Sequence, residues 1–205
     1  MPYSQFTTIT KVKEAFNLTT VEGIRFLPEI APIQPSISLV ATLEETLPLA
    51  VATGSEKARS ELIISPVLVE VRRILNRQIS LFSGEDFNVD ESLGLNGRCD
   101  FLISCSTEQL AIEAPAIIIV EAKQADLKTG IGQCVAEMVA AQKFNEAKQK
   151  PLPTLYGCVT NGLQWQFLQL IGNEVTIDLN IYSLPPVEQI LGFLVWMVRF
   201  DNRDF

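Results

Sequence analysis

Residues 117–123 constrain the fold of this chain more than any other stretch of its sequence. Four β-branched residues in succession, Ile117 to Val120, show no alternation of polar and apolar positions. This pattern is typical of a strand that is covered on both faces. The run ends in Glu121-Ala122-Lys123. Because residues two apart on a strand point to the same face, we expect the Glu121 carboxylate and the Lys123 ammonium to share one side at the strand's end.

The segments around this strand alternate between helical and extended patterns. The second expected helix has Ser55 as a plausible N-cap, and Pro66 should kink or restart it. Gly130-Ile131-Gly132 is interpreted as the loop that starts the third helix and not as a phosphate cradle. The expected helices cover residues 11–16, 55–77, 127–148 and 187–200.

The extended segments predict a mixed sheet. Ser83-Gly84 should break the first strand, and Asn161-Gly162 predicts a hairpin turn, since this dipeptide tolerates positive φ at both positions. The order of elements predicts an α/β fold, with a mixed central β-sheet flanked by helices. We expect residues 55–205 to form one globular domain, with residues 1–54 as an N-terminal extension packed on it. The expected strands cover residues 79–89, 97–105, 116–123, 155–160 and 163–168, with a further arm after Gly172-Asn173.

Composition narrows the class of protein. The 205 residues are 47% hydrophobic and 20% charged, which excludes intrinsic disorder. The net charge of −8 argues against broad electrostatic binding of nucleic acid. Four cysteines without a CxxC pair, in a chain without histidine, argue against a zinc finger. The N-terminal residues carry no signal-peptide pattern, so a cytoplasmic location is expected.

The apolar C-terminal helix, residues 187–200, is too short to span a bilayer, and we expect no membrane partner. Its apolar residues cover most of the helix circumference. The helix is therefore either deeply packed or an oligomer interface, and a homodimer through it is one expectation.

Asp100 and Glu121 are the candidate metal ligands. Asp100 lies near the start of its strand and Glu121 near the end of the next, so the two carboxylates converge if the strands are antiparallel neighbours. Carboxylate oxygens suit Mg²⁺ or Mn²⁺, and Lys123 could position or help deprotonate a water molecule. Taken alone, the spacing of Glu121 and Lys123 also fits a simple ion pair at a strand end.

Motifs in residues 55–170 occur in the order and spacing of a known family. They are Ser55-Glu56-Lys57-Ala58-Arg59-Ser60-Glu61, Ile64-Ser65-Pro66-Val67-Leu68, Gly97-Arg98-Cys99-Asp100, Val120-Glu121-Ala122-Lys123, Gln133, and Val159-Thr160-Asn161-Gly162-Leu163-Gln164-Trp165-Gln166-Phe167. Together they resemble the PD-(D/E)xK nuclease superfamily. The closest likeness is to the N-terminal nuclease domain of type I restriction enzyme motor subunits.

The resemblance implies a restriction endonuclease-like core and a role for each matching residue. Asp100 and Glu121 would be metal ligands, with the Ala122 carbonyl as a possible third. Lys123 would be the catalytic lysine, and Gln133 would orient water, Lys123 or a phosphate. The acidic residue of the first helix would be Glu56 or Glu61. We favour Glu61, because Glu56 lies in the first helical turn, where the helix dipole favours a carboxylate in any case.

Two features depart from the family pattern. Related domains often carry a tyrosine four residues after the helix glutamine, and here that position is Glu137. No GxxxxGK[ST] sequence occurs, so no nucleotide cofactor and no translocating motor are expected.

Three functions are consistent with the sequence. The first is a Mg²⁺- or Mn²⁺-dependent nuclease that hydrolyses DNA with a metal-activated water. The second is a catalytically silent nuclease fold used for binding or assembly, which the negative charge and the apolar C-terminal helix favour. The third is a nuclease subunit that cuts only when a partner supplies the DNA-binding surface. The sequence leaves open DNA against RNA, and endonuclease against exonuclease activity.

Overall fold

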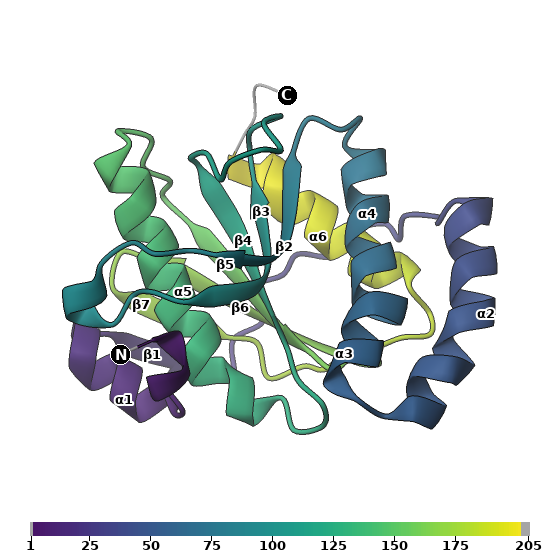
Figure 1. The fold of residues 1–205 in the computed structure, drawn as a ribbon, viewed down its shortest axis with the longest axis horizontal. Helices are drawn as coiled ribbons and strands as arrows, with labels where there is room; N and C mark the ends of the chain where they lie inside the picture. Colours follow the sequence, from purple (N-terminus) through teal and green to yellow (C-terminus); the bar gives the residue numbers. More distant parts are fainter. Residues whose placement is uncertain (1, 202–205) are drawn as a thin grey trace.

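Eight strands form a single mixed sheet with helices on both faces in the computed structural model, which describes residues 2–201 (Figure 1). The sheet order is β1-β7-β6-β5-β4-β3-β2, and β8 pairs with β6. The β1–β7 and β4–β5 pairs are parallel, and the other pairs are antiparallel. The strands are β1 (Thr19–Glu22), β2 (Ser80–Asp86), β3 (Arg98–Ser104), β4 (Ala116–Ala122), β5 (Leu155–Thr160), β6 (Gln164–Ile171), β7 (Glu174–Ile177) and β8 (Tyr182–Ser183).

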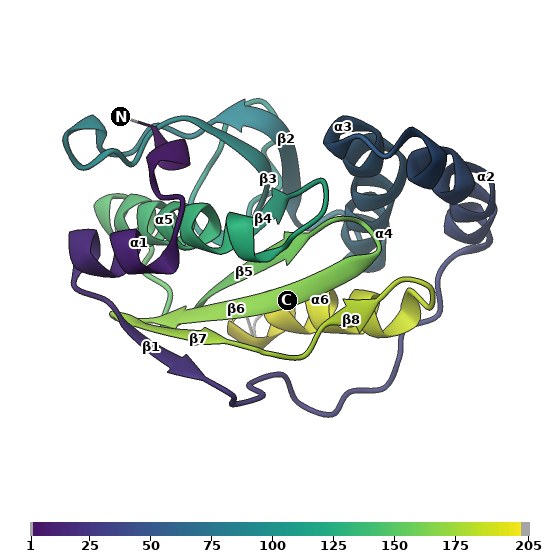
Figure 2. The same cartoon turned by 90° about the horizontal axis from the view of Figure 1, so that it is seen from below.

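The sheet divides the interior into two hydrophobic cores, and helices cover both of them. Helices α1 and α5 cover one face, while α6 lies across the other, as Figure 2 shows. Val135 and Met138 of α5 belong to the first core, and Val67 and Phe193 to the second. The helices are α1 (Ile9–Phe16), α2 (Ile37–Thr53), α3 (Glu56–Arg59), α4 (Ser65–Ile74), α5 (Lys128–Ala147) and α6 (Glu188–Asp201), with short 3₁₀ turns η1 (Tyr3–Gln5) and η3 (Glu91–Leu93).

Strand β4 confirms the expectation drawn from its β-branched run. All seven of its residues are buried, and it lies between β3 and β5 with a helical layer on each side. The predicted α/β class with a mixed, helix-flanked sheet is therefore confirmed.

The expected helix over residues 55–77 forms with an interruption. Ser55 caps it as predicted, since its side chain accepts a hydrogen bond from the Ala58 N–H. A π-helical turn, η2 (Ser60–Ile64), separates α3 from α4, and Pro66 lies in the first turn of α4. The chain stays helical from the π-turn into α4, where the Ser65 N–H donates to the carbonyl of Ser60, five residues back. The next residue, Pro66, has no N–H to donate, and the π-turn is the change in hydrogen-bond register that accompanies it.

Two expectations about glycines in the sheet were wrong in detail. Strand β2 continues from Ser80 to Asp86 through Ser83-Gly84, although Gly84 has a φ of 66° and no partner in the register with β3. The Asn161-Gly162 hairpin forms, but Gly162 and Leu163 are its central residues, since the Asn161 N–H donates to the Gln164 carbonyl. Gly162 has positive φ (84°) and Asn161 does not, as expected for a turn with glycine at its first central position.

Gly130-Ile131-Gly132 is also not a loop, because α5 begins at Lys128 and contains all three residues. A Cβ atom on Gly132 would lie 2.4 Å from the Phe6 carbonyl oxygen. Gly132 therefore permits close contact between α5 and the N-terminal segment. This packing explains the glycine without a phosphate-binding loop.

The apolar residues of α6 are buried within the chain. They include Ile190, Leu191, Phe193, Leu194 and Met197, each fully buried. Deep packing thus accounts for the composition of this helix, and a homodimer through it stays a prediction. Within residues 2–201, no helix is long and apolar enough to cross a membrane.

Candidate functional site

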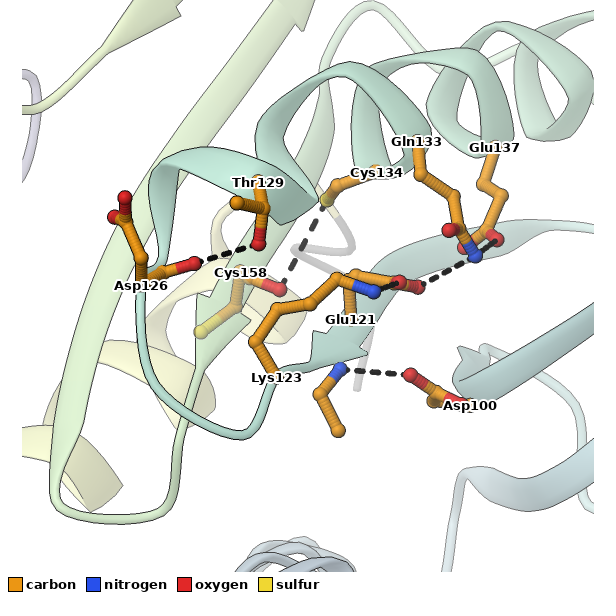
Figure 3. Close-up of polar contacts among 10 residues, drawn as sticks. Asp100, Glu121, Lys123, Asp126, Thr129, Gln133, Cys134, Glu137 and Cys158 are labelled. Carbon is orange, nitrogen blue, oxygen red and sulfur yellow. Dashed lines mark hydrogen bonds and ion pairs between the residues drawn. The ribbon is translucent and has the colours of Figure 1, made fainter. Parts of the chain in front are cut away.

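The antiparallel pairing of β3 and β4 brings Asp100 and Glu121 together. Phe101 pairs with Val120, so Asp100 and Glu121 lie one position further along the same register. The Ala122 N–H donates a hydrogen bond of 2.8 Å to Oδ2 of Asp100 (Figure 3). The predicted convergence of the two strand ends is confirmed.

Glu121 is the fully buried centre of the site. The Lys123 ammonium donates to its Oε1, and the Gln133 amide donates to its Oε2 over 3.1 Å (Figure 3). Lys123 and Glu121 therefore share a face at the end of β4, as predicted. Gln133 reaches them from the first half of α5, the helix that follows β4 in the chain.

Gly130 makes room for the lysine. A Cβ atom at this position would lie 2.7 Å from Cγ1 of Val159 and 3.0 Å from Cε of Lys123. The α5 backbone thus packs directly against β5 and the lysine stem. Sequence reasoning missed this function of Gly130, although a glycine inside a helical segment was the available signal.

The electrostatics of the carboxyl pair follow from burial and like charge. Burial and, to a smaller extent, the nearby Asp100 carboxylate raise the pKa of Glu121 to about 8, although the Lys123 ammonium opposes both effects. Burial also raises the pKa of Asp100, against the hydrogen bond from Ala122. Burial is the largest single effect and would lower the pKa of Lys123, but the Glu121, Glu56 and Asp100 carboxylates together raise that pKa above its ordinary value. The site consequently favours positive charge.

Glu137 lies behind Gln133 on α5 and is fully buried. Its Oε1 accepts a hydrogen bond of 3.1 Å from Nε2 of Gln133, the same atom that donates to Glu121. Burial and the Glu121 charge raise the pKa of Glu137 well above its ordinary value.

A cleft of about 270 Å³ opens between the helical segment α3–η2–α4 and strands β2 and β3. Asp100 lines it on the sheet side, and Glu56 and Glu61 line it on the helix side. Glu61 forms an exposed ion pair of 2.8 Å with Lys57. Glu56, in α3, has a negative charge that raises the pKa of both Glu121 and Lys123. Both carboxylates line the cleft, and the assignment of Glu61 as the acidic residue of this segment stays a prediction.

The residues present fit a divalent cation. Among residues 2–201 no group of three or more acidic, cysteine or histidine side chains forms a ligand set. Mg²⁺ nevertheless commonly binds proteins through one or two carboxylates, with water and substrate oxygens completing its shell. Asp100 and Glu121 supply two, and each carboxylate oxygen has a second lone pair beyond its present hydrogen bond. A ligand role for the Ala122 carbonyl stays a prediction.

Comparisons with known proteins leave the site to be interpreted from its own geometry. No protein-family model matches this sequence, and no curated protein matches it either.

Proposed function

We propose that this protein is a Mg²⁺- or Mn²⁺-dependent nuclease that hydrolyses phosphodiester bonds in DNA. The observation that supports this proposal is the convergence of the Asp100 and Glu121 carboxyls with the Lys123 ammonium at the end of two adjacent strands. The same residues carry the resemblance to PD-(D/E)xK nucleases, so the motif order and the geometry agree on one site.

Each side chain has a distinct part in the proposed reaction. Asp100 and Glu121 would hold the cation, whose positive charge would stabilise the charge that develops on the scissile phosphate. The Lys123 ammonium donates hydrogen bonds, and it can hold a phosphate oxygen or the attacking water. Gln133 keeps Glu121 in place through its amide. Glu56, on the opposite wall of the cleft, adds negative charge that favours cation binding.

Nicking of supercoiled plasmid tests the proposal. Wild-type protein with Mg²⁺ or Mn²⁺ should nick DNA, and Lys123→Ala should slow nicking by about 100-fold or more, the usual scale for losing one hydrogen-bond donor to the charge that develops in a transition state. Lys128→Ala, at an exposed position nearby, is the matched control and should cut normally. The proposal fails if wild type does not cut, or if Lys123→Ala cuts equally well.

A nuclease subunit that depends on a partner is the second candidate. The cleft beside Asp100 carries Glu56 and Glu61 against a single cation, Lys57, and the whole chain has a net charge of −8. Such a surface opposes binding of a phosphate backbone. Cleavage that appears only after products of neighbouring genes are added would favour this candidate. A silent fold used for assembly would show neither Mn²⁺ binding nor cleavage with any partner.

A further inference from the structure

The Gln133 amide is held between two carboxyl groups on opposite sides. Its Nε2 atom lies 3.1 Å from Oε2 of Glu121 and 3.1 Å from Oε1 of Glu137. A primary amide nitrogen carries two hydrogens, so each carboxyl receives its own N–H. Figure 3 shows this row of side chains, with Gln133 between Glu121 and Glu137.

Helix geometry places Glu137 where it can act on Gln133. The two residues are four apart on α5 and therefore neighbours on one face of the helix. Glu137 is fully buried, whereas Gln133 is half-buried. Glu137 thus supports the amide from the interior side, and Gln133 is its hydrogen-bonded link to Glu121.

Glu137 is a second acceptor that helps to hold the Gln133 nitrogen toward Glu121. In the present orientation the two hydrogens of this nitrogen go to Oε2 of Glu121 and to Oε1 of Glu137, so each contact restrains the amide. Without Glu137, one N–H would lose its partner, and the amide could rotate away from Glu121.

We propose that Glu137 is a positioning residue, which acts through Gln133 to orient the Glu121 carboxyl for cation binding and DNA cleavage. This inference rests on the proposed nuclease function. A buried carboxyl is costly to a fold, and an apolar residue of similar size would pack at this helix–sheet contact without that cost. In return, the Glu137 carboxyl holds the Gln133 amide in a fixed orientation.

Two substitutions separate positioning from folding. Glu137→Leu removes the acceptor and keeps an apolar side chain of similar size, while Glu137→Gln keeps an oxygen that can accept from Gln133. Glu137→Leu should unfold at the wild-type temperature or higher. It should nonetheless bind Mn²⁺ about 10-fold more weakly by calorimetry and cut DNA about 10-fold more slowly, the lower end of the range for residues that support metal ligands. KM for DNA should not change.

Glu137→Gln should restore most of the lost Mn²⁺ affinity and cleavage rate. Glu146→Leu, at an exposed position near the end of α5, is the control for a leucine on the same helix. If wild type binds Mn²⁺ and cuts, and Glu137→Leu equals it in both, the inference alone is overturned. The same holds if Glu137→Gln is as impaired as Glu137→Leu. A wild type that neither binds Mn²⁺ nor cuts would overturn the proposed function and this inference with it.

Discussion

Oδ2 of Asp100 accepts a hydrogen bond of 2.8 Å from the backbone N–H of Ala122, so a side chain of β3 is fixed to the residue between Glu121 and Lys123. This contact sets the position of one candidate ligand relative to the other. It also separates two properties of Asp100, the acceptor oxygen that holds the strands and the negative charge that would attract a cation.

Asp100→Asn should separate these two properties. Asparagine keeps an oxygen that accepts from the Ala122 N–H, so the free energy of unfolding should change by less than about 1 kcal/mol. Removal of the charge should lower the affinity for Mn²⁺ by about 10-fold or more, measured by calorimetry. Asp86→Asn, at an exposed position on β2, is the control and should bind Mn²⁺ as wild type does. Equal Mn²⁺ affinity in Asp100→Asn and wild type would exclude Asp100 as a ligand.

Gly130→Ala should damage the site through packing. Alanine normally stabilises a helix interior relative to glycine by about 0.5–1 kcal/mol. Here the new Cβ would lie 2.7 Å from Val159 and 3.0 Å from Lys123. We expect a net loss of about 1–3 kcal/mol, as for other overpacked sites, and slower cleavage because Lys123 must move. Chemical denaturation and plasmid nicking measure the two effects, and a stabilised, fully active variant would contradict the packing described.

Asn145 should be essential to the start of β4. Its Oδ1 accepts from the Ala116 N–H and its Nδ2 donates to the Ala116 carbonyl, each over 2.8 Å, and the side chain is buried. Asn145→Leu leaves both backbone groups without this partner, so the free energy of unfolding should fall by about 2–4 kcal/mol. Urea denaturation measures the loss, with the exposed Glu146→Leu as control at about 0.5 kcal/mol or less. A similarly small change for Asn145→Leu would refute this bridging role.

Glu70 should make stability depend on pH. It accepts hydrogen bonds from the Ser36 N–H (2.7 Å), at the N-cap of α2, and from Arg73. The hydrogen bond from Arg73 lowers the pKa of Glu70 below its ordinary 4.5 despite burial. A lowered folded pKa means that the stabilisation is complete above the ordinary pKa and is lost as pH falls through the folded one.

Glu70→Gln should therefore be less stable than wild type by about 1–2 kcal/mol near pH 7, the scale of hydrogen bonds to a charged group. The difference should shrink as the pH falls below 4.5. Thermal unfolding of both proteins across this range measures it, and a difference that stays constant down to pH 2 would show that the charge of Glu70 does not matter.

The parts of the fold that the sequence predicted depend on local patterns. The β-branched run of β4, the Ser55 cap and the Asn161-Gly162 hairpin are each specified by neighbouring residues, and each forms. The meeting of Asp100 and Glu121 needed one further assumption, the antiparallel pairing of their strands, and that pairing is present.

The parts that could not be predicted depend on distant contacts. Strand β1 has only four residues and exists through parallel pairing with β7, more than 150 positions away. Helix α2 contains Pro48 and is apolar on several sides, so no amphipathic period marks it. The preference for Glu61 over Glu56 rested on the helix dipole alone. The influence of Glu56 on Glu121 arises from how α3 is placed against the sheet, which a helical pattern does not contain.

The central claim is that Asp100 and Glu121 together hold a divalent cation beside Lys123. Anomalous diffraction from a crystal of the full chain soaked in Mn²⁺ tests it most directly. We predict an anomalous peak within coordination distance of both the Asp100 and the Glu121 carboxylates, absent from crystals of Asp100→Asn. A soaked wild-type crystal without a peak between these two carboxylates, with the Lys123–Glu121 ion pair unchanged, would contradict the claim.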